Sequence, residues 1–210
     1  MIAFDSATSA SDNSGVATSL TYAHTNAGSN LILMVGITIT TGTDLLTGVT
    51  YAGAAMTLVG KIQRNGAGNY EYLFYKINPA TGNNNVVASF SSAPPNIASG
   101  ACSYTGALQT GQPDSSATGT VAGADLTLTT TVVASNCWLV ACFGNSNSVF
   151  SSTGTQRVGA ILNTFFDSNG VVGTGAQSLQ VVFNTGGPTG GVIASIASAP
   201  EAGGGFFAFF

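Results

Sequence analysis

His24 is the only histidine in the chain, so it is the first residue to test for chemistry. A Ser-His-Asp relay needs an imidazole held by an acid beside an activated serine. Serines are abundant, but none stands in the Gly-x-Ser-x-Gly turn that exposes a nucleophile between a strand and a helix. His24 follows a predicted strand and precedes the turn-forming residues 25–28. We therefore expect a histidine in a loop, with no catalytic function.

The acidic residues offer no local site. The chain has eight of them, and none lies within four residues of another: Asp5, Asp12, Asp44, Glu71, Asp114, Asp125, Asp167 and Glu201. A calcium loop needs several oxygen ligands within about a dozen residues, so the sequence encodes no such loop. Folding could bring two carboxylates together as a glycosidase pair, but the sequence favours no particular pair.

Metal and phosphate sites are not indicated either. One histidine and three scattered cysteines do not reproduce the ligand spacing of a zinc site. The glycine clusters at 186–187, 190–191 and 203–205 are not followed by the helix pattern that a phosphate-binding loop requires. We therefore predict a protein that is not an enzyme, with no catalytic residues, no metal and no cofactor.

Aromatic side chains are the next candidates for binding. Tyr70, Tyr72 and Tyr75 recur within one predicted strand, and Trp138 stands in another. Carbohydrate-binding sandwiches stack sugars on aromatic rings of this kind, so we retain Tyr70, Tyr72 and Trp138 as a candidate glycan-stacking set. Packing within the core is the alternative that we favour, because aromatic residues suit buried strands.

The most unusual feature is the end of the sequence, where residues 202–205 (Ala-Gly-Gly-Gly) form a predicted tether to four phenylalanines. In an extended segment Phe206 and Phe210 point to one side, and Phe207 and Phe209 to the other. Each phenylalanine can bury roughly 150–250 Å², so four exposed rings would form an aggregation-prone patch. We expect these rings to bind a partner surface. That surface belongs either to their own domain or, as we favour because a glycine tether provides reach, to a neighbouring chain.

The composition excludes several classes of protein. The chain has 210 residues with 4 Lys+Arg and 8 Asp+Glu, and charged residues make up 6% of it. An ordinary soluble domain has roughly 25%. So few cations cannot build a nucleic-acid-binding face, and a hydrophobic share of 44% is too high for a disordered chain. Between Lys76 and Arg157 there is no basic residue. Contacts with partners must therefore depend on hydrogen bonds and shape.

The three cysteines, Cys102, Cys137 and Cys142, are an odd number, so they cannot form a complete disulfide framework. Cys137 and Cys142 lie in one apolar run, and in a strand they would be about 16 Å apart on opposite faces, too far for a bond. We predict buried, reduced thiols, which fit synthesis inside the cell.

The start of the chain shows no secretory pattern. A signal peptide opens with a basic region, whereas the first basic residue here is Lys61. We therefore expect a protein that is used where it is made. The longest apolar run, residues 31–37, is far shorter than the roughly 20 residues of a membrane-spanning helix, so we expect no membrane partner.

Hydrophobic residues recur with a period of two along most of the chain. Residues 31–39 are apolar on both faces for most of their length and predict a central strand. Residues 49–51 and 56–59 flank 52–54 in a hairpin pattern, and the Asn-Asn-Asn sequence at 83–85 predicts a turn. Further predicted strands, with turn clusters between them, are 3–4, 19–22, 70–77, 86–90, 97–104, 125–133, 137–143, 157–162, 164–166, 178–183 and 192–197.

About a dozen short strands without a helical stretch predict an all-β fold. The expected architecture is an antiparallel β-sandwich of the jelly-roll or a related Greek-key type, with very little helix. The sequence shows no linker before residue 200 and no repeat of fixed period. We predict one β-sandwich domain over residues 1–200, followed by the glycine tether and aromatic tail over 201–210.

Several turn and strand motifs carry a family resemblance. They are Val-Thr-Tyr-Ala-Gly at 49–53, Asn-Pro-Ala-Thr-Gly at 78–82 with the strand at 83–90, Ser-Tyr-Thr-Gly at 103–106, and the segment from Gln109 to Pro113. Over roughly residues 15–145 the chain resembles Gly/Ser/Thr/Asn-rich β-sandwich modules of environmental bacterial and phage proteins. This resemblance implies a fold but no catalytic residues. By composition the chain also resembles phage capsid decoration and fibre proteins.

These features lead us to expect a structural virion protein of a bacteriophage. We expect a capsid decoration or cement subunit, or a head-surface fibre subunit, assembled into the virion in the host cytoplasm. Its partners would be copies of itself, with a trimer favoured, and other virion subunits such as the major capsid protein. Two alternatives remain: a carbohydrate-binding or adhesive module at the cell surface, and a self-assembling extracellular filament subunit.

Overall fold

The computed structural model describes residues 1–64, 68–159 and 162–200, and every helix or strand assigned in these ranges is a β-strand. No helix long and apolar enough to cross a membrane occurs among these residues. The strands are β1 (Ala3–Asp12), β2 (Ser19–Asn26), β3 (Ile32–Ile39), β4 (Leu46–Tyr51), β5 (Ala54–Ala55), β6 (Thr57–Gln63), β7 (Tyr70–Ile77), β8 (Gly82–Phe90), β9 (Ile97–Thr105), β10 (Ser115–Val121), β11 (Asp125–Val132), β12 (Trp138–Gly144), β13 (Val149–Ser152), β14 (Thr155–Gly159), β15 (Thr164–Asp167), β16 (Gly175–Phe183) and β17 (Thr189–Ile196).

Strands β1 to β9 form a jelly roll, which we call the first unit. The first strand pairs with the last (β1 with β9), and the pairing continues inward as β2 with β8, β3 with β7 and β4 with β5, always antiparallel. Successive pairs alternate between two sheets, with the orders β1-β9-β3-β7-β6 and β2-β8-β4-β5. The chain is thus a long hairpin rolled into two layers, which is the jelly-roll topology. The predicted fold class is confirmed.

Strands β10 to β17 repeat this topology in a second unit. Here β10 pairs with β17, β11 with β16 and β12 with β15, in sheets of order β10-β17-β12-β15-β14 and β11-β16-β13. The two five-stranded sheets have equivalent strand orders: the positions of β1, β9, β3, β7 and β6 in the first are taken by β10, β17, β12, β15 and β14 in the second. The molecule therefore contains the same fold twice, although the sequence shows no repeat.

Backbone conformation marks equivalent points in the two units. Gly82 and Gly175 are the first residues of β8 and β16, and both have a left-handed φ (86° and 93°). In both β8 and β16 the fifth, seventh and ninth residues of the strand are buried. Asn30 and Asn136 also have a left-handed φ (51° and 60°), and each stands two residues before the central strand of its unit. What the units share is turn geometry and alternation, which many sequences satisfy.

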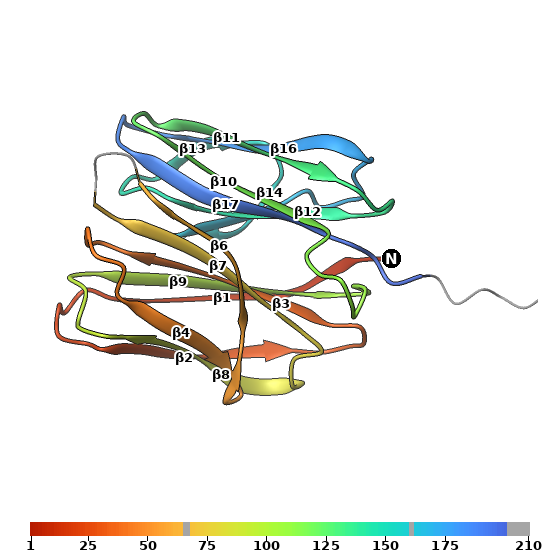
Figure 1. The fold of residues 1–210 in the computed structure, drawn as a ribbon, viewed down its shortest axis with the longest axis horizontal. Coiled ribbons are helices and arrows are strands. Elements are labelled where there is room, and N and C mark those ends of the chain that lie inside the picture. Colours follow the sequence, from red (N-terminus) through yellow and green to blue (C-terminus); the bar gives the residue numbers. More distant parts are fainter. Residues whose placement is uncertain (65–67, 160–161, 201–210) are drawn as a thin grey trace, which may run out of the picture.

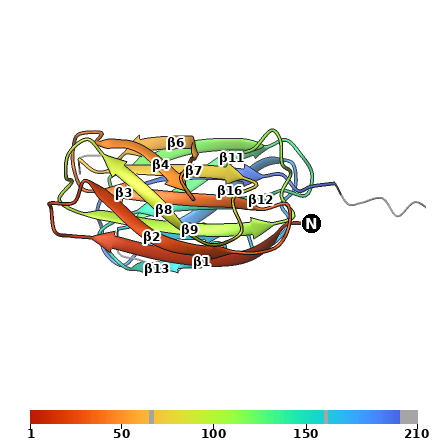
Figure 2. The same cartoon turned by 90° about the horizontal axis from the view of Figure 1, so that it is seen from below.

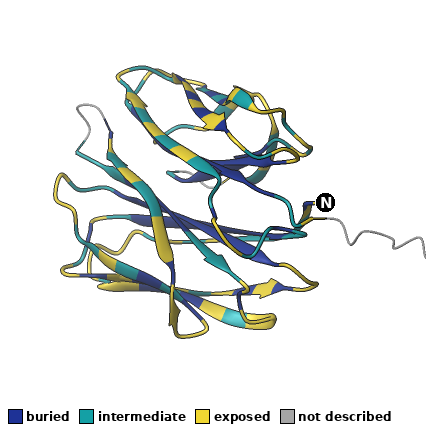
Figure 3. Ribbon diagram, turned by 45° about the vertical axis from the view of Figure 1, so that its right-hand side comes forward, coloured by how far each residue is buried: buried dark blue, intermediate teal, exposed yellow. Residues whose placement is uncertain are grey.

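Four layers of sheet result from this arrangement (Figure 1). The two five-stranded sheets pack against each other in the middle, and each carries its smaller sheet on its outer face. Seen from below, strands β2, β8 and β4 lie in front of the inner sheet (Figure 2). The inner strands β3, β12 and β17 are buried at every residue, because both of their faces are covered (Figure 3).

Glycines let the two inner sheets approach each other closely, and they do so reciprocally. In the first unit Gly36 of β3 and Gly100 of β9 are cross-strand partners. A Cβ added to Gly36 would lie 2.7 Å from Cε2 of Phe165, and one added to Gly100 would lie 3.2 Å from Cδ2 of the same ring. The two glycines form a recess that receives the Phe165 ring from β15 of the second unit.

The second unit holds the matching recess. Gly144 of β12 and Gly190 of β17 are cross-strand partners. A Cβ added to Gly144 would overlap the carboxylate of Glu71, and one added to Gly190 would lie 2.8 Å from Cγ of Arg64. This recess therefore receives two side chains of the first unit.

Arg64 and Glu71 form an ion pair buried between the units. The Nε of Arg64 lies 3.0 Å from Oε1 of Glu71, and both side chains are almost completely buried. Thr38 donates its hydroxyl to Oε2 of Glu71, and Nδ2 of Asn163 in the second unit donates to Oγ1 of Thr38 at 3.0 Å. Burial raises the pKa of Glu71 to about 8, although the neighbouring Arg64 guanidinium opposes this shift.

A second ion pair, formed within the second unit, contacts the first unit through both of its members. Arg157 of β14 donates to Asp167 of β15 through Nε at 2.7 Å and Nη2 at 3.1 Å. The Arg157 guanidinium lies 4.1 Å from the ring centroid of Phe4 in β1, and Tyr104 of β9 donates to Oδ2 of Asp167 at 3.1 Å. Charged groups of this chain are thus used in part to fix one unit against the other.

Some predicted elements differ from the structure. The asparagines at 83–85 lie inside β8, not in a turn, because Gly82 takes the left-handed conformation that the turn requires. The sequence pattern does not predict β10 or β13, and it predicts only two of the ten residues of β1. All three strands are rich in small polar residues, so they lack the apolar alternation that marks a strand. The predicted central strand at 31–39 is confirmed. The predicted turn at 52–54 is present, but residues 54–55 form the second arm of the hairpin, whereas 57–59 lie in β6 and pair with β7 of the other sheet.

The three cysteines are free and buried, as predicted. Cys142 belongs to the core between the two inner sheets, and Cys137 to the core between the sheets of the second unit. The two thiols therefore lie on opposite faces of the same sheet.

The recess around Phe165 gives a first prediction. We expect Gly36→Ala to lower the free energy of unfolding by about 1–3 kcal/mol, because the added methyl group overfills the interface between the units. Urea unfolding measures this change. Gly48→Ala is the matched control, since Gly48 lies in β4 with nothing within 4 Å of an added Cβ, and we expect a change within about 0.5 kcal/mol. Equal effects of the two substitutions would contradict the recess.

The ion pair gives a second prediction. The folded-state pKa of Glu71 is raised from 4.5 to about 8, so the stability that its protonation contributes is present below pH 4.5 and is lost as the pH rises through 8. Glu71→Gln cannot ionise. We therefore expect the urea concentration at the unfolding midpoint of the wild-type chain, relative to that of this variant, to decrease as the pH is raised from about 5 to about 9. A difference between the two midpoints that stays constant across this pH range would refute the raised pKa of Glu71.

Candidate partner-binding surface

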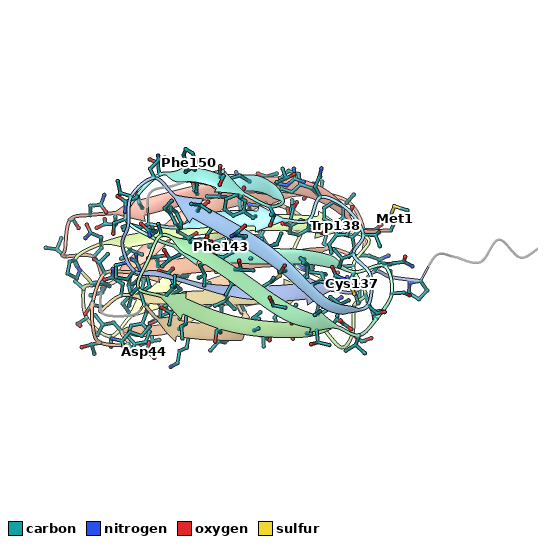
Figure 4. All side chains as sticks on the ribbon, turned by 90° about the horizontal axis from the view of Figure 1, so that it is seen from above. Met1, Asp44, Cys137, Trp138, Phe143 and Phe150 are labelled. Carbon is teal, nitrogen blue, oxygen red and sulfur yellow. The ribbon has the colours of Figure 1, made fainter. Side chains whose placement is uncertain are left out.

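An apolar pocket lies at the end of the molecule where β17 leads to Pro200, and we call it the end pocket. Its volume is about 310 Å³, and none of the described residues that line it carries a charged side chain. The apolar part of its wall consists of Met1, Leu108, Ala134, Val171, Ala197, Ala199 and Pro200, and the polar part consists of Ser135, Asn136 and Ser198. Figure 4 shows Met1, Cys137 and Trp138 at this end of the molecule.

Hydrogen bonds between distant segments hold the end pocket in shape. The backbone N–H of Leu108 donates to the carbonyl of Ala197 at 2.8 Å, and that of Val172 donates to the carbonyl of Cys137 at 2.8 Å. The pocket is therefore formed before any ligand arrives. Sequence reasoning missed it because its wall comes from segments far apart in the chain, and no local pattern reveals such a site.

The chain leaves the end pocket at a fixed point. The N–H of Ala199 donates to the carbonyl of Gly106 at 2.8 Å, and Pro200, the last described residue, is part of the pocket wall. Outside the described residues lie the predicted partner-binding side chains Phe206, Phe207, Phe209 and Phe210. Their role stays a prediction, but the structure shows where the segment that carries them begins.

The outer faces of the molecule are almost free of charge. The seven strands of the two outer sheets contain one charged residue, Asp125, which accepts a hydrogen bond from Nε2 of Gln180 at 2.8 Å. The exposed positions of β11 otherwise present Thr127, Thr129 and Thr131. A neighbour that packs on such a face meets hydroxyl and amide groups, which can be buried at much lower cost than charges when hydrogen-bonded.

One large apolar side chain protrudes from an outer sheet. Phe150 is the extra residue of an irregularity in β13, an edge strand, and it is 73% exposed. Figure 4 shows it at the margin of the molecule. An exposed edge strand with a protruding aromatic ring offers a contact point to another chain.

The candidate glycan-stacking residues occupy two separate places. Tyr70 and Tyr72 lie on β7 with stacked rings, whose centroids are 5.9 Å apart. Tyr72 is 2% exposed and donates its hydroxyl to Oδ1 of Asp44 at 2.6 Å. Trp138 is 7% exposed and packs edge-on against Tyr104 in the core between the units. The structure brings the two tyrosines together, leaves Trp138 apart, and gives Tyr72 and Trp138 no open ring face.

The position of His24 differs from our expectation of a loop. It lies inside β2 and is completely buried, because the strand continues through Asn26, which pairs with Gly82. The Nδ1 of His24 lies 2.9 Å from Oγ1 of Thr8, and its Nε2 lies 3.1 Å from Oγ of Ser103. The ring is therefore held between β1 and β9.

The direction of the hydrogen bonds around His24 argues against a nucleophile. Ser103 donates its hydroxyl proton to Oδ2 of Asp5 at 2.7 Å, so the Nε2 of His24 must donate to Ser103 instead of accepting from it. The Nδ1 atom then accepts from Thr8. A serine nucleophile needs the opposite arrangement, in which the imidazole accepts the serine proton. This network positions the ring in the core.

The described carboxylates are dispersed, and each has its own partner. The contacts are Asp5 with Ser103, Asp12 with Ser14, Asp44 with Lys61, Glu71 with Arg64, Asp114 with the backbone of Val133, Asp125 with Gln180 and Asp167 with Arg157. No group of three or more His, Cys, Asp or Glu side chains within the described ranges could hold a metal ion.

Comparison of the chain with protein-family models and with curated proteins finds no match.

The buried imidazole gives a third prediction. Burial lowers the pKa of His24 from 6.5 to about 4. Between these two pH values the imidazole is neutral in the folded chain and protonated in the unfolded chain. Its contribution to stability is present above pH 6.5 and is lost as the pH falls toward 4, on the order of 3 kcal/mol in total. We expect His24→Gln to reduce this pH dependence, measured as the free energy of unfolding in urea between about pH 7 and about pH 4.5. The carboxylates titrate in both proteins and cancel in the comparison. Parallel curves would show that His24 is not the responsible group.

Proposed function

We propose that this chain is a structural subunit of an assembled particle, and specifically a capsid decoration or cement protein of a bacteriophage virion. The observation that carries the proposal is the surface of the two outer sheets, whose seven strands contain one charged residue. A fibre subunit of the head surface is the nearest variant of the same function.

A neutral surface of this kind suits permanent contacts between subunits. Burying a charge against a neighbour requires a partner for it, whereas hydroxyl and amide groups can pair with whatever neutral group they meet. Little Coulomb energy contributes to such contacts, so they are insensitive to ionic strength. Copies of the chain would assemble symmetrically, with a trimer favoured, on a lattice of the major capsid protein.

The aromatic tail would supply the apolar part of these contacts. Four phenylalanines follow a glycine tether that begins at the fixed point beside the end pocket. Phe150 on β13 offers a second apolar contact at another margin of the molecule. In this role the neutral faces would supply broad contacts that depend little on charge, and a small number of aromatic side chains would anchor them.

A carbohydrate-binding or adhesive module is the second candidate. A hollow of about 550 Å³ on the outer sheet of the first unit is lined by Asn83, Asn84, Asn85 and Thr50, among others. Amide and hydroxyl groups are suitable partners for sugar hydroxyls. None of the described residues that line the hollow is aromatic, so they offer no ring for stacking, and we therefore place this function second. Saturable binding to a glycan array would favour it.

The proposed function gives a fourth prediction. Particles that carry the subunit should retain it in about 1 M NaCl and release it in a few molar urea or guanidinium chloride, because the contacts depend on burial and not on charge. Quantitative mass spectrometry of washed particles measures the retained fraction. Release by salt alone, in particles whose coat stays intact, would contradict the proposal.

A further inference from the structure

We infer that the end pocket is the socket for the aromatic tail of a second copy of this chain. The inference rests on the proposed function and deepens it, since it names the partner of the tail and the surface that receives it. It joins two features that are independent of each other: the preformed apolar pocket, and the four phenylalanines whose tether begins at the pocket wall.

The size and chemistry of the end pocket fit a phenyl ring. An apolar cavity of roughly 150 Å³ holds one benzene molecule, so a pocket of about 310 Å³ accepts one ring with room to spare and two at most. Met1, Leu108, Val171, three alanines and Pro200 form most of its wall, and Ser135, Asn136 and Ser198 complete it. None of the described lining residues has a charged side chain that could pair with a charged ligand.

The arrangement of the tail points to a second copy as its binding partner. An extended segment presents Phe206 and Phe210 on one side and Phe207 and Phe209 on the other. A chain that bound its own tail in one pocket would leave the opposite pair facing water, which is unfavourable by the full hydrophobic free energy of those rings. A tail that lies between two copies is covered on both sides.

The length of the tether limits where the second copy can be. Six residue steps separate Pro200 from Phe206, which span at most about 20 Å when extended. Because Pro200 is itself part of the pocket wall, the pocket of the neighbour must lie within this distance of the donor's own pocket. A symmetry axis that passes close to Pro200 satisfies the condition for every copy at once. Both a twofold and a threefold axis then give closed assemblies in which each copy donates one tail and receives one.

Separating the socket from the tail tests the inference. The full-length variant Val171→Trp fills the pocket and keeps the tail; Val171 is 48% exposed, so the fold tolerates the change. The full-length variant F206S/F207S/F209S/F210S keeps the pocket and lacks the aromatic rings. Val16→Trp is the matched control, because Val16 is 77% exposed in the loop between β1 and β2 and does not line the pocket. Sedimentation velocity over a range of concentrations measures self-association, and circular dichroism checks the fold of each variant.

We expect the wild-type chain and Val16→Trp to associate equally. Each of the other two variants alone should associate at least about tenfold more weakly. An equimolar mixture of these two should recover association as pairs that contain one of each, seen by native mass spectrometry, because one variant supplies the tail and the other the socket. If Val171→Trp does not fold, Ser135→Trp at the exposed rim replaces it.

Two results would overturn the inference. Undiminished association of both variants would show that copies bind through another surface, and the proposed particle function would stand without the socket. Monomers throughout, with no pairs in the mixture, would show that the tail binds its own chain or a different subunit. The proposed function is tested by a separate observation: loss of the subunit from particles in salt would contradict the function, whatever the result for the socket.

Discussion

The structure depends on the contact between its two inner sheets. Each of these sheets is apolar on both faces, so neither can exist without a cover on each side. One cover is the smaller sheet of the same unit, and the other is the inner sheet of the opposite unit. The requirement makes the two jelly rolls mutually dependent, and it explains why a single core contains residues of both units.

Glycine placement makes that contact close and gives it one register. Each inner sheet carries a cross-strand glycine pair, and each pair faces large side chains of the opposite sheet: Phe165 in one direction, and Glu71 with Arg64 in the other. A shift of one sheet against the other would drive these side chains into backbone. The interface is therefore specified by shape. Hydrogen bonds that cross it from Asn163 to Thr38 and from Tyr104 to Asp167 add to this specification.

The sequence predicts the fold class well and the site poorly, and the reason lies in how each is encoded. Local alternation predicts the buried strand at 31–39, which is confirmed. Turn residues predict the chain reversal at 52–54, which is also present, although residues 57–59 pair with β7 and not with 49–51. Strand β10 (Ser115–Val121) is held by its pairing with β17 and has few apolar side chains, so no local pattern reveals it. The neighbours of His24 favour a turn and so predict a loop, whereas sheet pairing extends the strand through them. The glycines at 36, 100, 144 and 190 did offer a signal, since glycine within a strand often marks close approach of another segment. The end pocket offered none, because it is assembled from distant segments.

The position of β17 determines how a load on the end of the chain would be shared. This strand lies between β10 and β12 and pairs with each of them over seven residues. Tension applied beyond Pro200 therefore acts along the strand and shears two ladders at the same time, after the bond between Ala199 and Gly106 has given way. Ladders loaded in this direction must break together, not one bond after another. A subunit moored by this end would be a mechanically strong element in any assembly that swells or comes under internal pressure.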